Sequence, residues 1–213
     1  MGKIMGLIMA GGRGGRLKMH VEKPMLKVNG IPLIKRAVDA CLESRCIQKV
    51  YVAVSQNTLE TAGYLTSLAI PSVEVIQTPG VGYHDDMKTA IRAIGTDNRF
   101  IVMAADIPSL KAGTIDKIAM RFIESGKPAL AVFAPKGLFE RVGLKPTTII
   151  KVDGEECVPC GINAIDGSYI DEEGYLDEVA MVIRDPDVCM NINTRTDLRA
   201  YRKGQGERLK KGR

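Results

Sequence analysis

An alternation of apolar strands and amphipathic helices fills the first 135 residues, and no other feature of the sequence restricts the fold as much. Strands are predicted at 3–9, 50–54, 73–76, 100–105 and 129–134, and helices at about 32–45, 58–68, 83–94 and 113–125. Strands that are apolar along their whole length and are joined by helices form a largely parallel sheet that is covered on both faces. The sequence therefore predicts an α/β fold with a doubly wound, mostly parallel sheet.

The pattern changes after residue 140, where a small antiparallel C-terminal portion is expected. Residues 147–152 and 156–164 flank a turn at Asp153 and Gly154, as in a β-hairpin. A strand near 180–184 and a helix near 194–202 complete the predicted elements. Because the chain has no repeat and no low-complexity linker, residues 1–203 are expected to form a single domain, and residues 204–213 a basic C-terminal tail.

The positive charge of the chain is concentrated near its C-terminus. The formal net charge is +5, but the segment from Arg199 to Arg213 holds seven Lys or Arg and one Glu, so the rest of the chain is close to neutral. Such a run is typical of a solvated, partly disordered end. Aromatic residues make up only 5% of the chain and do not interleave with a basic stripe, so no nucleic-acid partner is expected.

The composition, with 45% apolar and 26% charged residues, is that of an ordinary soluble globular protein. No apolar run reaches the roughly 18 residues that a membrane span requires, and no signal-peptide cleavage site follows the apolar start, so a cytoplasmic location is expected.

The five cysteines are an odd number, which favours free thiols. Cys157 and Cys160 form a lone C-x-x-C without the second pair that a structural zinc needs, so structural roles are expected.

The segment LIMAGGRGGRLKMHVEKPMLKV, residues 7–28, places a glycine-rich and strongly cationic loop directly after the first strand. In open α/β sheets, ligands bind beyond the carboxyl ends of the strands. Glycines allow successive backbone N–H groups to approach an anion closely. The full charges would come from Arg13, Arg16, Lys18 and Lys23. Together these features predict a binding site for a polyphosphate.

Two common glycine-loop classes are excluded by inspection. A Walker A loop needs Gly-Lys followed by Ser or Thr, which this chain lacks, and a dinucleotide fingerprint starting at Gly12 would need glycine where Leu17 stands. The pattern that remains is A-G-G-x-G-x-R from Ala10 to Arg16, with Glu22-Lys23-Pro24 a few residues later.

This pattern resembles the signature of the MobA-like nucleotidyltransferases, which include molybdenum-cofactor guanylyltransferases and sugar-1-phosphate nucleotidyltransferases. Over most of the chain the sequence is more similar to the archaeal adenosylcobinamide-phosphate guanylyltransferases of cobamide biosynthesis. That similarity is carried by LIMAGGRGGRL, VEKPMLKVNGIPLI, VAVSQNTLET, TPGVGYHDDM, PCGINAI and NINTRTDL. The resemblance implies a Rossmann-like nucleotidyltransferase fold. It also implies transfer of GMP from GTP to adenosylcobinamide phosphate, with release of pyrophosphate.

The resemblance implies a catalytic role for Arg16, Lys23 and Asp106. Lys23 would neutralise the α-phosphate, and Arg16, together with Arg13, would hold the leaving pyrophosphate, since a guanidinium grips phosphate oxygens in a bidentate manner. Mg²⁺ is the implied cofactor, with Asp106 and Asn193 as its ligands. Two structural alternatives stay open, because Asp106 could instead cap the turn that follows it, and Asn193 could cap the helix near residue 194.

The implied binding residues fall into two groups. The guanine edge would be read by residues after the second and third strands, so that the nucleotide-binding residues are Ala10, Gly11, Gly12, Arg13, Gly14, Gly15, Arg16, Lys23, Ser55, Asn57, Thr78, Gly80 and Asp106. The acceptor would contact Gly161, which permits close approach, and Asn163, which offers a donor and an acceptor. Because the corrin ring of this acceptor is large and apolar, an exposed apolar rim is also expected, although spacing does not locate it.

Other functions remain open at this stage. The same chemistry could use molybdopterin, a sugar 1-phosphate or phospholactate as the acceptor. A nucleotide-binding protein without catalytic activity is an alternative of another class, although it would have less need of Asp106 beside Lys23. The sequence leaves a homodimer open.

Overall fold

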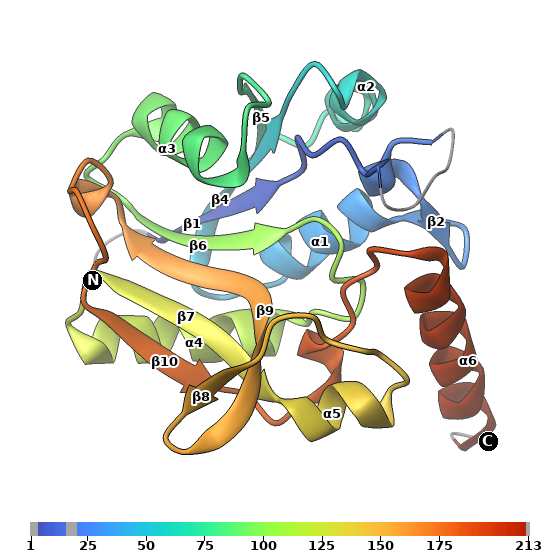
Figure 1. Cartoon of the computed structure of the whole chain (residues 1–213). Coiled ribbons are helices and arrows are strands. Elements are labelled where there is room, and N and C mark those ends of the chain that lie inside the picture. The colour runs from blue at the N-terminus through green and yellow to red at the C-terminus, as the bar shows by residue number, and fades with distance from the viewer. Residues whose placement is uncertain (1–3, 16–20, 212–213) are drawn as a thin grey trace.

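The computed structural model describes the backbone of residues 4–15 and 21–211, with side chains up to residue 203 (Figure 1). The main sheet has eight strands: β1 (Ile4–Met9), β4 (Ile47–Val54), β5 (Val73–Gln77), β6 (Arg99–Ala104), β7 (Ala129–Pro135), β8 (Ile150–Val152), β9 (Glu155–Asp166) and β10 (Glu178–Val182). The helices are α1 (Leu33–Leu42), α2 (Leu59–Ser67), α3 (Tyr83–Ile94), α4 (Ala112–Ser125), α5 (Lys136–Arg141) and α6 (Arg195–Lys211). Short 3-10 turns, η2 (Lys23–Met25), η3 (Gly167–Tyr169) and η4 (Pro186–Val188), and the two-stranded ribbon of β2 (Lys27–Val28) and β3 (Ile31–Pro32) complete the fold.

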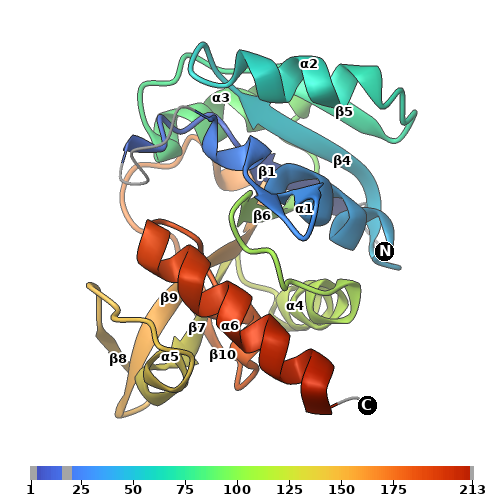
Figure 2. The same cartoon turned by 90° about the vertical axis from the view of Figure 1, so that its right-hand side faces the viewer.

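The predicted doubly wound α/β fold is confirmed. The sheet order is β10-β7-β9-β6-β1-β4-β5, and β6, β1, β4 and β5 run parallel to one another. Side chains along β1 alternate between the two faces: Ile8 packs in the cluster that contains α1 and α4, whereas Leu7 packs with Ile91 of α3. Both faces of the parallel strands are thus covered by helices (Figures 1 and 2).

The long strand β9 differs from the expectation of a separate antiparallel portion. It does pair with β8 as a hairpin, but it also runs antiparallel between β6 and β7 and so becomes a central strand of the main sheet. Its buried side chains on both faces explain this position, since Ile162 and Ala164 pack on the α1 and α4 side and Ile165 packs on the α3 side. The expected strand 147–152 is shorter than predicted and begins at Ile150.

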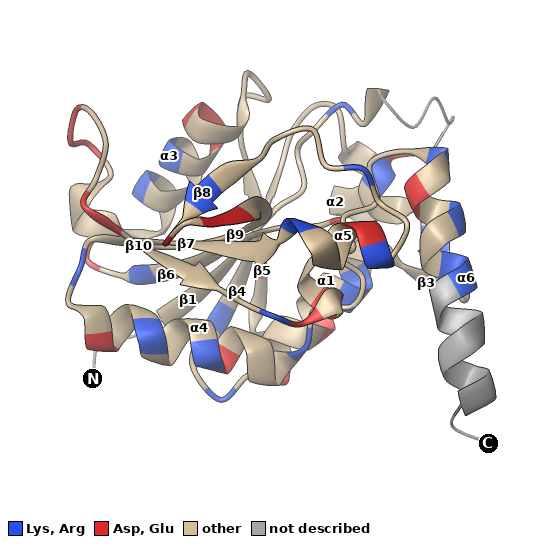
Figure 3. Cartoon of the chain, turned by 60° about the horizontal axis from the view of Figure 1, so that its bottom comes forward, with Lys and Arg blue, Asp and Glu red and all other residues tan. Residues whose placement is uncertain are grey.

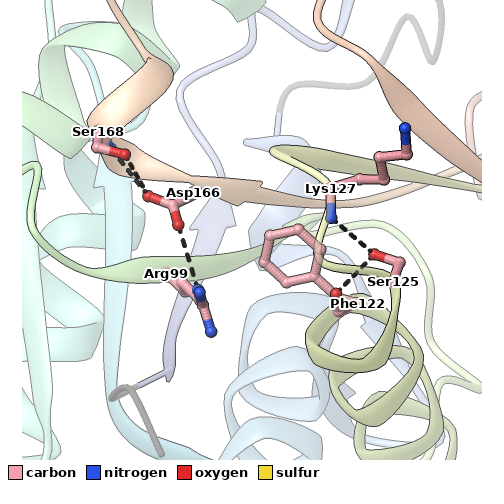
Figure 4. A network of polar contacts seen from close by, with 6 residues as sticks. All are labelled: Arg99, Phe122, Ser125, Lys127, Asp166 and Ser168. Atoms are coloured by element: carbon pink, nitrogen blue, oxygen red, sulfur yellow. Dashed lines mark hydrogen bonds and ion pairs between the residues drawn. The ribbon is translucent and has the colours of Figure 1, made fainter.

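Polar contacts fasten the far end of β9, away from the glycine loop (Figure 4). Arg99 at the start of β6 donates a hydrogen bond of 3.2 Å to Asp166 at the end of β9. The same carboxylate accepts hydrogen bonds from the backbone N–H and hydroxyl of Ser168. Arg99 and Asp166 are register partners in the β6–β9 ladder, and Ile162 near the other end of that ladder pairs with Met103, close to the carboxyl edge of the parallel strands.

The last helix extends beyond its predicted end near residue 202. Thr194 and Asp197 form a capping box, in which the Asp197 carboxylate accepts from the N–H groups of Asn193 (2.9 Å) and Thr194 (2.7 Å). The helix continues to Lys211, and Lys and Arg recur along its described part (Figure 3). The domain boundary at residue 203 and the partly disordered basic tail beyond it both stay predictions.

All five cysteines are free thiols, and four of them are buried. Burial raises the pKa of Cys41 and Cys189 to about 12, and it raises the pKa of Cys160 further still. Cys157 and Cys160 lie in β9 within the core, which fits the expected structural role.

None of the described helices combines the length and the apolar character that crossing a membrane would demand.

Candidate active site

Three segments meet at the carboxyl end of β1 and β6: the glycine loop, the turn after β6, and the segment before α6. Their backbones are joined directly, because Ala10 N–H donates to Ala53 O (2.8 Å), Ala105 N–H to Met9 O (3.2 Å) and Ile192 N–H to Asp106 O (3.0 Å). The last of these bonds brings the chain just before α6 against the turn that holds Asp106. Residues more than 80 positions apart in the sequence thus share one edge of the sheet.

A cavity of about 470 Å³, the loop cavity, opens at this edge. Its described lining is Met9, Ala10, Gly12, Arg13, Gly14, Gly15, Lys23, Pro24, Ala104, Ala105, Asp106 and Asn193. It therefore brings together most of the residues predicted for the phosphates and the metal. Arg16, the remaining predicted catalytic residue, lies outside the described residues.

The glycines of the loop serve two different purposes. Gly14 has a φ of +61°, and a Cβ there would lie 3.1 Å from Cβ of Lys23, so glycine allows the loop to pack against the lysine that follows it. Gly11 is also tightly packed, because its Cβ would lie 3.2 Å from Cβ of Ser55. Gly12 and Gly15 have open space instead, which leaves their backbone accessible from the cavity.

Lys23 lies between the two predicted metal ligands. Its ammonium forms an ion pair with Oδ2 of Asp106 and donates a hydrogen bond of 2.8 Å to Oδ1 of Asn193. Asp106 is only 8% exposed, and its Oδ1 is buried without a hydrogen-bond partner among the described residues. Thr194 and Asp197 make the capping box of α6, and the Asn193 side chain accepts the hydrogen bond from the lysine.

Glu22 is a site residue that the sequence analysis missed. Its carboxylate accepts hydrogen bonds from the N–H of Glu60 (2.8 Å), the N–H of Thr61 (2.7 Å) and the hydroxyl of Thr61 (2.5 Å), all in the first turn of α2. Thr58, the residue at the N-cap position of α2, makes no side-chain cap itself. Glu22 thereby caps α2 from a distant segment and holds the backbone next to Lys23. Its only sequence signal is its place directly before Lys23-Pro24.

A second cavity of about 650 Å³, the α3 cavity, lies next to the first at the start of α3. Its described lining is Met9, Gly11, Gly12, Arg13, Gln56, Asn57, Gly80, Val81, Gly82, Tyr83, Asp86 and Ala104. Met9, Gly12, Arg13 and Ala104 also line the loop cavity, so the two cavities adjoin along the glycine loop.

The four residues predicted to read the base divide into two pairs. Asn57 and Gly80 line the α3 cavity, whereas Ser55 and Thr78 are not among its described lining residues. The Ser55 hydroxyl donates to Gly11 O (2.7 Å), and the Thr78 hydroxyl donates to Val54 O (2.9 Å). Both hydroxyls are buried and in use, so these two residues hold the loops in place in this structure.

Gly80 is the most constrained glycine of the site. Its φ is +75°, and a Cβ there would lie 2.9 Å from Cβ of Ser55 and 3.1 Å from Nδ2 of Asn57. The N–H of Gly80 donates a hydrogen bond of 2.8 Å to Oδ1 of Asp86, which is 6% exposed. Glycine is therefore required for the loop before α3 to approach the loop after β4.

The two predicted acceptor residues contact different parts of the structure. Gly161 has a φ of +70°, and a Cβ there would lie 3.1 Å from Nδ2 of Asn191. Asn163 lies near the phenol of Tyr83 at the start of α3 and lowers the pKa of that phenol. Desolvation raises the pKa of that phenol, and the contact with Asn163 opposes the shift. Neither residue is among the described lining of the loop cavity or the α3 cavity.

A doubly wound sheet with a cationic glycine loop after its first strand, and a buried carboxylate beside a lysine, defines a nucleotide-binding transferase of the α/β class. The chain belongs to the family with a MobA-like NTP transferase domain, whose model matches residues 6–207. It is a nucleotidyltransferase.

Two curated relatives illustrate the family. The adenosylcobinamide-phosphate guanylyltransferase of Methanocaldococcus jannaschii is 35% identical over 200 residues, which cover 91% of this chain and 93% of that protein. A Thermococcus gammatolerans protein named "Probable molybdenum cofactor guanylyltransferase" is 25% identical over 94% of this chain and 100% of its own length. Among solved structures, CMP:2-keto-3-deoxy-manno-octonic acid synthetase complexed with CTP has the same fold, with a TM-score of 0.74, 14% identity and coverage of 97% of this chain and 99% of that one.

Proposed function

We propose that this protein transfers GMP from GTP to adenosylcobinamide phosphate and releases pyrophosphate. The observation that carries the proposal is the 35% identity, over 91% of the chain, to the Methanocaldococcus jannaschii enzyme of that name. The two adjoining cavities along the glycine loop support it, because together they offer room for a triphosphate and a base.

In this reaction an oxygen of the acceptor phosphate attacks the α-phosphorus of GTP. The bond between the α-phosphorus and the oxygen that bridges to the β-phosphate breaks, and pyrophosphate leaves with that electron pair. Because the nucleophile is already an anion, the protein needs no strong general base. Its task is to hold two polyanions in line and to reduce their repulsion.

The cations of the loop cavity are suited to that task. Lys23 is assigned to the α-phosphate, and Arg13 and Arg16 to the pyrophosphate that leaves. To reach the nucleotide, the Lys23 ammonium exchanges its contacts with Asp106 and Asn193 for phosphate oxygens. Backbone N–H groups of Gly12 and Gly15, which have open space beside them, add neutral donors for the same oxygens.

The donor set of the loop cavity fits Mg²⁺. Asp106 Oδ1 is a buried carboxylate oxygen without a partner among the described residues, and Asn193 contributes an amide oxygen nearby. Mg²⁺ prefers hard oxygen ligands and takes one or two from the protein when substrate phosphates supply others. The bound ion would neutralise charge on the phosphate oxygens.

Guanine is assigned to the α3 cavity, with Asn57 and the backbone of Gly80 as readers of its edge. Asn57 donates to Ser55 Oγ at 3.1 Å, and its side chain stays within reach of the cavity. Ser55 and Thr78 are assigned a supporting role, in which they hold the loops that form this cavity. Gly161 and Asn163 remain the proposed acceptor residues.

Pyrophosphate release tests the proposal directly. Purified protein with Mg²⁺ is incubated with GTP, ATP, CTP or UTP, either without an acceptor or with adenosylcobinamide phosphate, a sugar 1-phosphate or molybdopterin. We expect release only with GTP and adenosylcobinamide phosphate together. Release with a sugar 1-phosphate or molybdopterin instead would move the assignment to the alternatives within the family, and no release with any acceptor would favour a nucleotide-binding protein without activity.

A further inference from the structure

A third cavity, the α6 cavity, lies beside the loop cavity and has no role so far. It has a volume of about 270 Å³ and is enclosed by the segment 144–148, by Val158 and Pro159 of β9, and by the residues around the start of α6. Asn193 lines both the α6 cavity and the loop cavity, so a ligand in one lies next to a ligand in the other. The loop from α5 to β8 and the chain before α6 both contribute lining residues to it.

We infer that the α6 cavity receives the phosphate-bearing end of the acceptor, a bulky apolar phosphomonoester with amide groups, and that Lys145 contacts that phosphate. This inference rests on the proposed function and specifies where the second substrate binds. The chemistry of the cavity, its size and its rim each support it.

The polar groups of the α6 cavity match a phosphomonoester with amide groups. Its exposed lining residues Lys145, Thr147 and Thr148 offer one cation and two hydroxyls, while the Asp197 carboxylate in the same lining accepts from the N–H groups of Asn193 and Thr194. Asn191 has a buried Oδ1 without a hydrogen-bond partner among the described residues, and this oxygen requires a donor such as an amide N–H. Asn191 lies close to the backbone of β9 because residue 161 is glycine, which links the predicted acceptor residue to this cavity.

The volume of the α6 cavity indicates which part of the acceptor it can enclose. Pockets that enclose a drug-sized ligand measure roughly 300–1,000 Å³, so a cavity of about 270 Å³ cannot enclose a tetrapyrrole-like ring. The ring must therefore stay outside the cavity. Ile149 and Ile150 follow the lining residue Thr148 directly in the sequence, and they are 42% and 38% exposed. In this placement they would serve as the apolar rim that the sequence analysis expected but did not locate.

This placement is compatible with the transfer reaction. With its phosphate between Lys145 and Asn193, the acceptor approaches the loop cavity from the side of α6, whereas the base lies on the side of α3. In-line transfer then requires the attacking oxygen to lie opposite the bond to the departing pyrophosphate, which is assigned to Arg13 and Arg16 of the glycine loop. The apolar floor of Phe139, Leu144 and Val158, each less than 9% exposed, limits water around the phosphate.

The test compares Lys145→Ala and Ile149→Ser with Lys151→Ala, which removes an exposed lysine of β8 outside the described lining of the α6 cavity. Binding of adenosylcobinamide phosphate without GTP is measured by equilibrium dialysis, read by corrin absorbance, and KM is measured for each substrate by pyrophosphate release. Loss of one charged hydrogen bond predicts an increase of about tenfold in Kd and KM for the acceptor in Lys145→Ala. Ile149→Ser is expected to raise both about threefold.

In all three variants we expect the KM for GTP to stay unchanged, and Lys151→Ala to match the wild type in every measurement. The inference is overturned if the wild type uses the acceptor and Lys145→Ala binds it equally well, or if KM for GTP rises in parallel. A wild type that neither binds nor converts adenosylcobinamide phosphate would instead overturn the proposed function, and the inference with it.

Discussion

The two halves of the carboxyl edge are built in different ways. On the proposed nucleotide side, the loops are joined to one another by hydrogen bonds, such as the buried bond of Ser55 to Gly11 and the partly buried bonds of Glu22 to the first turn of α2. On the side of β8 and α6, the segment 145–150 is largely exposed, and Asn191 beside it has a buried oxygen without a partner among the described residues. A triphosphate requires the same preorganised donors whatever the acceptor is, whereas the acceptor differs among relatives. The rigid half therefore defines the chemistry, and the open half is suited to defining the second substrate.

The largest effect is expected from Lys23→Ala, which removes the cation between Asp106 and Asn193. Loss of one positioned donor to a developing charge typically lowers turnover by about 10²–10³-fold, and we expect at least that here. Turnover is measured by pyrophosphate release, and folding by circular dichroism. Lys27→Ala is the matched control, because Lys27 is an exposed lysine of the adjacent ribbon. A Lys23→Ala protein that retains near wild-type turnover would contradict the role given to Lys23, and the same test applies to Arg16→Ala.

Asp106→Asn tests whether the rigid half also holds the metal. The substitution keeps the shape of the side chain but removes the charge that Oδ1 and Oδ2 share. We expect turnover to fall by about 10²-fold and Mn²⁺ binding in the presence of GTP to weaken, since hard cations favour carboxylate oxygen. Mn²⁺ is followed by electron paramagnetic resonance, which reports binding independently of activity. Asp116→Asn is the control, because this carboxylate accepts from Ser44 at the far end of α1. Unchanged Mn²⁺ binding would remove Asp106 from the metal site.

Gly80→Ala tests the packing of the locked loops. The new Cβ would lie 2.9 Å from Cβ of Ser55 at a φ of +75°, and Ser55 is itself held by its bond to Gly11. We expect the free energy of unfolding to fall by about 1–3 kcal/mol, together with a higher KM for GTP. Gly113→Ala is the opposite control: Gly113 lies in α4 with open space around it, so alanine should stabilise the protein by up to about 1 kcal/mol. Urea denaturation compares the two, and equal stabilities would refute the constraint at Gly80.

The parallel strands and the glycine loop were predictable because local patterns encode them. Continuous apolar runs fix β1, β4 and β6, and glycine density fixes the loop. The position of β9 in the centre of the sheet was not predictable in this way, because it depends on pairing between Phe100 and Ile165, residues far apart in the sequence. The different roles of Asn57 and Ser55 were also not predictable from local sequence. They depend on a contact with a distant residue, because the Ser55 hydroxyl is hydrogen-bonded to the carbonyl of Gly11.

The smallest effect is expected from substitutions of Glu22, which test how the loops on the nucleotide side are held together. Glu22→Ala removes the cap of α2, which should cost about 0.5–2 kcal/mol of stability, because two N–H groups and a hydroxyl lose their acceptor. If Glu22 also positions Lys23, kcat should fall several-fold while KM for GTP changes less. A loss of stability alone would not change kcat and KM differently in this way. Glu22→Gln keeps one acceptor oxygen and should restore part of kcat. Glu60→Ala removes an exposed acid from the same first turn and should leave kcat unchanged, so equal kcat values in Glu22→Ala and Glu60→Ala would reduce Glu22 to a helix cap.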